Sequence, residues 1–157
     1  MPSSQPDVAP EDPLALERQV CFALSVASRV VVQAYRPVLE PLGLSHPQYL
    51  VMLALWGGAP VSLRELSASL RLEPATLSPL LQRLEAAGLV TRERRADDAR
   101  TLDVGLSAQG AALRERALSV PTTMAERLGL DATHLEQLHG LMTTLIAAAD
   151  RAGERTP

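Results

Sequence analysis

Apolar residues recur every three or four positions near both ends of the chain, the spacing of one face of a helix. The N-terminal pattern predicts a helix that begins at Asp12–Pro13 and runs to about Tyr35 or Leu42. Two apolar stripes lie on this segment, so we expect the helix to be buried on two sides and to form part of a dimer interface. The stripes are Val20, Leu24, Ala27, Val31, Ala34 and Val38, and Cys21, Ser25, Ser28, Val32 and Tyr35.

Capping and breaking residues divide the middle of the chain into shorter helices. Ser45 is expected to cap a helix that ends at Gly57–Gly58. Ser62 and Glu65 form a capping box, which opens another short helix. After a three-residue turn, a further helix is predicted over Pro74–Ala87. Two short helices around such a turn fit the helix-turn-helix motif.

After the predicted helix over 74–87, the spacing of apolar residues changes from the three-to-four-residue period of a helix to the alternation of a strand. Leu89–Arg94 and Thr101–Leu106 read as two strands, and the polar segment between them, 95–100, reads as the tip of a hairpin. Ser107 is expected to cap a helix that breaks near Pro121. Asp131 is expected to cap the last helix.

The predicted fold class is mainly α with a small β-hairpin wing. A winged helix-turn-helix, 45–106, lies between helices predicted for dimerisation, 13–44 and 107–150. The 157 residues suggest a single domain, 13–150, with a disordered tail over 1–12 and a C-terminal tail over 151–157.

The distribution of charge is more informative than the net charge of −3. Every basic residue apart from histidine is arginine, and six arginines stand against five acids between Arg71 and Arg100. Such a local cluster can bind phosphates on a mildly acidic protein. A single cysteine, no visible secretion signal and no long apolar run together predict a cytoplasmic protein that does not cross a membrane.

Several short runs of residues resemble the MarR family of bacterial transcription regulators. The resemblance covers roughly residues 14–150 and is strongest to the organic-hydroperoxide-sensing (OhrR-like, one-cysteine) branch. It implies a homodimeric repressor, not an enzyme, that binds a pseudo-palindromic DNA operator without a cofactor and responds to oxidative stress. The runs are Cys21–Leu24, Ala34–Pro37, Leu42–Leu44, Pro47–Leu50, Thr76–Leu81, Arg83–Glu85 and Gly88–Val90.

The helix over 74–87 is the predicted recognition helix. Its candidates for DNA contact include hydroxyl residues and longer polar side chains that can pair with bases. An interior proline is costly in a helix, and the resemblance favours a locally distorted but continuous helix. The alternative is that the longer side chains form only a solvated face. The candidates are Thr76, Ser78, Pro79, Gln82 and Arg83.

The wing carries Arg94, Arg95 and Arg100, and an arginine at a hairpin tip can enter the minor groove. Asp98 is expected to hold the Arg100 guanidinium, as the Asp-x-Arg pattern of the family implies. The alternative is an ordinary solvated turn with a local ion pair.

Cys21 is the candidate redox sensor, although a lone cysteine in a helix is more often a small buried hydrophobe. The resemblance implies that tyrosine hydroxyls activate the sulfur, and Tyr35 matches one such position. Tyr35 lies about 21 Å along the same helix, so it would have to act across a dimer. Where the family has further aromatic residues, this chain has Ser25 and His46. Three roles for His46 stay open: a hydrogen-bond donor to the sulfur, a charged group that stabilises a thiolate, or a polar residue in the first turn of a helix with no redox role.

Oxidation by an organic hydroperoxide, followed by capping with a small cellular thiol, is the favoured trigger. Two alternatives stay open at this point. One is a MarR-type repressor that senses a small aromatic ligand while Cys21 is inert, and the other is a thiol peroxidase. His134 and His139 are poorly spaced for one helical face, so no metal site is expected.

Overall fold

The computed structural model describes residues 12–154, which divide into two compact units that meet between Ala34 and Tyr35. The first unit holds a 3-10 helix, Leu16–Arg18, and most of helix α1, Val20–Leu39. The predicted helix start at Asp12–Pro13 is wrong. The Asp12 carboxylate accepts the N–H of Leu14 in a local turn, a bond that competes with helix formation. The predicted tails lie mostly outside the described residues.

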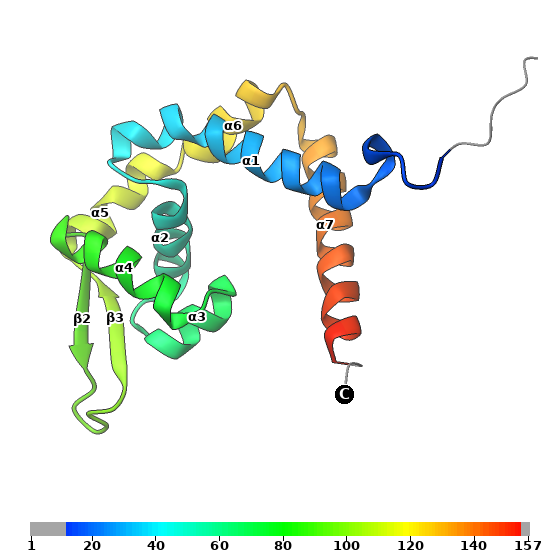
Figure 1. Cartoon of the computed structure of the whole chain (residues 1–157). Coiled ribbons are helices and arrows are strands. Elements are labelled where there is room, and N and C mark those ends of the chain that lie inside the picture. Colours follow the sequence, from blue (N-terminus) through cyan, green and yellow to red (C-terminus); the bar gives the residue numbers. More distant parts are fainter. Residues whose placement is uncertain (1–11, 155–157) are drawn as a thin grey trace, which may run out of the picture. The chain divides into compact units, whose positions relative to one another are not determined.

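The second unit contains the helix-turn-helix, the hairpin and the C-terminal helices (Figure 1). Each predicted helix of this part is present, and the segment around Pro121 is broken into two helices. The elements are a 3-10 helix, Glu40–Leu42; α2, His46–Gly58; β1, Val61–Ser62; α3, Leu63–Leu70; α4, Pro74–Ala86; β2, Val90–Arg94; β3, Leu102–Leu106; α5, Ala108–Ala117; α6, Val120–Leu128; and α7, Ala132–Gly153.

The predicted caps of the later helices are confirmed, at Ser45, Ser62, Ser107 and Asp131. The Ser45 and Ser62 side chains each accept the backbone N–H of the third helical residue. In return, the side chains of Gln48 and Glu65 accept the backbone N–H of the cap residue. Ser107 and Asp131 cap α5 and α7 through their side-chain oxygens. These bonds satisfy backbone donors that the first turn of a helix leaves without partners.

The hairpin belongs to a three-stranded antiparallel sheet with the order β1-β3-β2. In its register Val90 pairs with Leu106 and Arg94 with Leu102, as the predicted hairpin requires. Strand β1 was not predicted, because two residues are too few to show an alternating pattern. It joins the base of the wing to the start of α3, since Ser62 pairs with Asp103.

One core holds the helix-turn-helix and the sheet together. Its most buried side chains come from α1, α2, α3, α4, β3 and α6: Leu39, Val51, Met52, Leu55, Leu66, Leu77, Leu81, Leu84, Val104 and Val120. Tertiary burial of this kind, more than helix propensity, stabilises helices as short as α3.

The expectation that the N-terminal helix is buried on two sides is not met within one chain. Leu39 is the only α1 residue that is buried, and Val20 and Val30 stay 64% and 54% exposed. Helix α7 buries none of its residues. Its exposed apolar side chains are Leu135, Leu138, Leu141, Met142, Leu145 and Ile146. Within residues 12–154 no helix is both long enough and apolar enough to cross a bilayer.

Candidate nucleic-acid interface and thiol site

Helix α4 packs into the core by one side and leaves the opposite side exposed. Leu77, Leu81 and Leu84 are buried at spacings of four and three, which is one face of a helix. Four of the five predicted contact residues are exposed, namely Thr76, Pro79, Gln82 and Arg83, and Ser78 is half-buried. The polar side chains of α4 are therefore available to a partner while the apolar ones hold the helix in place.

The helix is continuous through Pro79, as the family pattern implied. Pro79 has no N–H to donate to the carbonyl four residues earlier. In the same turn, the Ser78 hydroxyl donates to the Pro74 carbonyl at 2.8 Å. Because the Ser78 hydroxyl already donates its proton within the helix, its oxygen can only accept a hydrogen bond from a partner.

An ion pair that the sequence analysis missed fixes the end of α4 against the sheet. The Arg92 guanidinium of β2 donates to Glu85 of α4 through Nε, at 2.9 Å, and through a second nitrogen. Both side chains are partly buried, and the bond is charge-assisted. The ion pair therefore holds α4 and the wing in one orientation to each other. Nothing in the spacing of two residues separated by a turn signals this contact.

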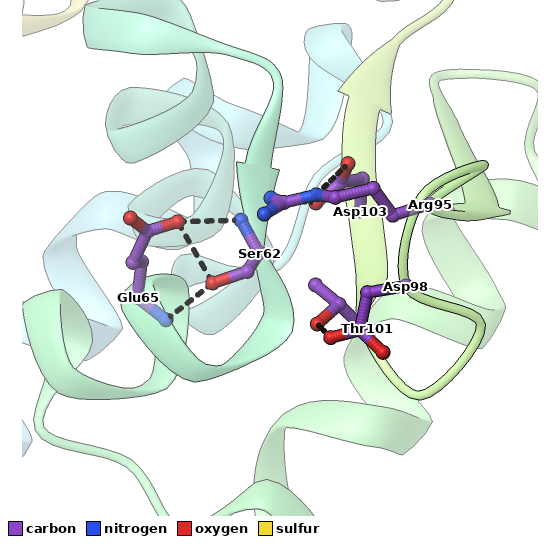
Figure 2. Close-up of polar contacts among 6 residues, drawn as sticks. All are labelled: Ser62, Glu65, Arg95, Asp98, Thr101 and Asp103. Atoms are coloured by element: carbon purple, nitrogen blue, oxygen red, sulfur yellow. Dashed lines mark hydrogen bonds and ion pairs between the residues drawn. The ribbon is translucent and has the colours of Figure 1, made fainter.

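Two of the three wing arginines are engaged within the wing. Arg94 donates to the Ala99 carbonyl at 2.7 Å. Arg95 pairs with Asp103 through two hydrogen bonds of 3.0 and 2.7 Å, and this pairing lowers the pKa of Asp103 (Figure 2). Asp103 is a further residue that sequence reasoning missed, although its place between Leu102 and Val104 put it on the polar face of the strand.

The expected role of Asp98 needs a correction. Its carboxylate accepts the hydroxyl of Thr101 at 2.7 Å (Figure 2). It also accepts the backbone N–H of Arg100 at 3.1 Å. The Thr101 bond first, and the Arg100 N–H second, lower the pKa of Asp98. Asp98 therefore fixes the backbone at the tip instead of the Arg100 guanidinium. An Asp two residues before an N–H reaches it in a local turn more readily than it reaches the end of a long side chain.

The start of α3 lies beside the base of the wing. Glu65 accepts the N–H and the hydroxyl of Ser62 at 2.8 and 2.7 Å, and these two bonds lower the Glu65 pKa. Figure 2 shows the Arg95 side chain reaching from the wing toward this capping box. A hollow of about 850 Å³ lies between α3, the start of α4 and the wing, and is lined by Arg64, Arg71, Arg95 and Arg100 among others.

Cys21 lies in the first turn of α1 as an exposed free thiol, so the alternative of a buried small hydrophobe does not describe it within one chain. Ser25, which stands where the family has an aromatic residue, donates its hydroxyl to the Cys21 carbonyl at 2.9 Å. The Ser25 hydroxyl is therefore bonded to the helix backbone.

The second unit gathers three aromatic rings from α1 and α2. The Tyr35 ring lies 4.9 Å from the ring of His46 and 5.9 Å from that of Tyr49, measured between centroids. Tyr35 and His46 are both predicted redox-site residues, and the structure brings their side chains together. Burial raises the pKa of Tyr49, and the neighbouring Tyr35 adds to this effect.

Burial lowers the pKa of His46 from its ordinary value of 6.5. A ring with a pKa below 6.5 is mostly neutral at neutral pH, because desolvation disfavours its charged form. The expectation that a charged His46 stabilises a thiolate is therefore not supported. A neutral ring keeps one N–H donor, so a hydrogen bond from His46 to the sulfur stays a prediction.

No group of three or more potential metal ligands occurs among residues 12–154. His134 pairs with the Asp131 carboxylate at 2.7 Å, in the first turn of α7.

The buried helix-turn-helix, its exposed α4 face and the adjoining arginine-bearing hairpin define a winged helix-turn-helix DNA-binding protein. Comparisons with known proteins specify the family. Residues 44–102 match the model of the MarR family. Over 135 residues the chain is 36% identical to the organic hydroperoxide resistance transcriptional regulator of Bacillus subtilis (strain 168), covering 86% of this chain and 92% of that protein. The chain belongs to the MarR family.

Solved structures agree with this assignment. Reduced AbfR bound to DNA superposes with a TM-score of 0.77 at 30% identity, covering 87% of this chain and 94% of that one. AbfR is a protein of Staphylococcus epidermidis. CouR from Rhodococcus jostii RHA1, bound to p-coumaroyl-CoA, superposes with a TM-score of 0.72 at 26% identity, covering 84% of this chain and 94% of that one.

The protein is therefore a DNA-binding transcriptional regulator with the predicted fold class. Its relatives are regulators rather than enzymes, so the thiol peroxidase alternative is set aside.

Proposed function

We propose that the chain is a cytoplasmic, homodimeric repressor that senses organic hydroperoxides through Cys21 and releases its operator when this thiol is oxidised. The observation that carries the proposal is an exposed lone thiol on α1, the helix that also carries Tyr35, whose ring lies against that of His46 at the start of α2. Two relatives support it. The Bacillus subtilis relative is named for organic hydroperoxide resistance, and AbfR has been solved in reduced, disulfide-formed and overoxidised forms.

Dimerisation is proposed from the apolar side chains that one chain leaves exposed. The α7 stripe of leucines, Met142 and Ile146 lies at helical spacing, and α1 adds Val20, Phe22, Val30 and Val32. Exposed apolar surface of this extent marks an interface, because its burial is favourable. In an antiparallel pairing of α1 helices, Tyr35 and His46 of one protomer would meet Cys21 of its partner.

DNA binding is proposed to use the residues that the fold leaves exposed. Thr76, Pro79, Gln82 and Arg83, together with the Ser78 acceptor, would face the major groove. Arg100 would enter the minor groove from a tip that Asp98 holds. Arg94 and Arg95 shape the hairpin and add positive charge.

The proposed chemistry starts from the Cys21 thiolate. The sulfur attacks the terminal peroxide oxygen, the O–O bond breaks, and the alkoxide leaves and takes up a proton to form the alcohol. The sulfur is oxidised by two electrons to a sulfenic acid. The chain has no second cysteine, so a small cellular thiol then forms a mixed disulfide with release of water, or the sulfenic acid cyclises or is oxidised further.

The test is DNA retention with and without cumene hydroperoxide for the wild type and Cys21→Ser, with DNA upstream of the chain's own gene as the probe. We expect the reduced proteins to bind alike, and peroxide to release only the wild type, because serine has a similar size and cannot form a sulfenic acid. His46→Ala should slow oxidation and His46→Tyr should restore the rate. Release of the Cys21→Ser protein by peroxide contradicts the proposal.

A second candidate function rests on a separate hollow of about 260 Å³ beside α2, α5 and α6. Aromatic walls, Tyr49 and Trp56, face it together with the cation Arg114, a combination that suits a small aromatic anion. In this alternative Cys21 is inert and the ligand triggers release. Quenching of the single tryptophan by an aromatic acid, lost in Arg114→Ala, would favour it.

A further inference from the structure

The hollow between the helix-turn-helix and the wing lies where a DNA strand would pass. The strand that separates a major groove from the adjacent minor groove runs between an element in the first and an element in the second. Here these elements are α4 and the wing. The hollow is lined by α3, by the turn that carries Arg71, by the first residue of α4 and by the wing with Arg95 and Arg100. Phosphates of that strand would therefore meet its arginines.

Arg71 is one of these arginines, and its guanidinium is paired with a carboxylate of a helix that is distant in the sequence. Its two terminal nitrogens donate to the two oxygens of Asp150 in α7, at 2.8 and 2.9 Å. The pair joins residues 79 positions apart. The side chains are 63% and 47% exposed, so solvent screens the attraction and the pair contributes little to stability.

The backbone of Arg71 is unusual for an arginine. It ends α3 in the left-handed conformation, with φ of 51°, where glycine is the usual residue. Strain of this kind at a non-glycine residue often accompanies a functional side chain. The paired carboxylate oxygens present the same two acceptors to a guanidinium as a phosphate does.

We propose that Asp150 is an internal competitor of a DNA phosphate for Arg71. In the free protein the C-terminal helix holds the guanidinium, and on binding the DNA backbone displaces Asp150. The affinity of the helix-turn-helix for DNA is thereby set in part from α7. The inference rests on DNA binding through α4 and the wing and is independent of the chemistry of Cys21.

The test uses the full chain and a labelled duplex of mixed sequence, about 30 base pairs long, titrated by fluorescence anisotropy at roughly 50 to 200 mM salt. Asp150→Asn should bind up to roughly fivefold more tightly than the wild type, with the gain shrinking as salt rises. Glu136→Gln, on the same helix and exposed, is the matched control for the loss of one negative charge.

Arg71→Gly separates binding from folding. Glycine suits the left-handed backbone, so the melting temperature should hold or rise, while DNA binding weakens and the salt slope falls by about 0.9. In the double variant Arg71→Gly/Asp150→Asn, the Asp150 substitution should have no further effect on DNA binding, because the guanidinium that Asp150 binds is absent.

Two outcomes overturn the inference while DNA binding itself stands. One is that Asp150→Asn binds no more tightly than Glu136→Gln, and the other is that it weakens binding as Arg71→Gly does, which would make the pair a structural clasp. A wild-type chain that does not bind the duplex at any salt concentration would instead contradict the docking of α4 and the wing.

Discussion

Gly110→Ala should disrupt the packing of α5 against Leu89, at the start of the wing, and destabilise the fold. A Cβ atom on Gly110 would fall on the carbonyl of Leu89, with the Leu89 carbonyl carbon only 2.9 Å away. The obstacle is backbone, so no change of rotamer relieves it. The Gly110 carbonyl also accepts the Trp56 indole N–H at 2.9 Å, which ties α2 to α5. The chain must therefore separate α5 from Leu89 or distort the helix start.

The expected magnitude follows from three effects. Overpacking costs about 1–3 kcal/mol, and loss of the Trp56 bond costs about 1 kcal/mol more. Alanine regains about 1 kcal/mol of helix propensity. The free energy of unfolding should fall by about 2 kcal/mol, which corresponds to a melting temperature lower by roughly 4–8 °C.

Circular dichroism gives the melting temperature, and emission of Trp56 reports the contact itself, because the chain has one tryptophan. Gly57→Ala is the control, since its Cβ would meet nothing within 4 Å, and it should be neutral or slightly stabilising. A Gly110→Ala protein that melts at or above the wild-type temperature with unchanged emission refutes the reasoning.

Three further results are expected. Arg100→Ala should weaken DNA binding by roughly tenfold and flatten its salt dependence, measured by anisotropy; unchanged binding at moderate salt removes the wing from the interface. Because the folded pKa of His46 is lowered below 6.5, its contribution to stability is present above pH 6.5 and is lost as the pH falls through the folded pKa. His46→Gln should then lose less stability than the wild type between pH 7 and 5 in thermal melts. Sedimentation at micromolar concentration should give a dimer, and a monodisperse monomer that binds DNA tightly contradicts the roles of α1 and α7.

The sequence predicted the elements of the DNA-binding part because each leaves a local signal. The cap at Ser45, the capping box at Ser62 and the alternation of Leu102, Val104 and Leu106 are readable within a few residues, and all were confirmed. The fold class followed from their order.

Contacts between distant residues left no such signal. Arg95 with Asp103, Arg71 with Asp150, and the three-ring cluster around Tyr35 depend on how elements pack. The start of α1 was misjudged because Asp12 and Pro13 suit a turn as well as they suit a helix cap. The charge of His46 could not be judged without knowing its burial.

Hydrogen bonds within the wing hold its conformation in the absence of DNA. Arg94, Arg95 and Asp98 each bond to other groups of the hairpin, so its tip holds one arrangement in the free protein. A loop that is disordered until it binds would lose conformational entropy in the complex, and that loss would weaken the affinity. Here most of that entropy is already lost on folding. Asp103→Asn, which releases Arg95, should therefore make DNA association more entropically unfavourable without removing any group that touches the duplex.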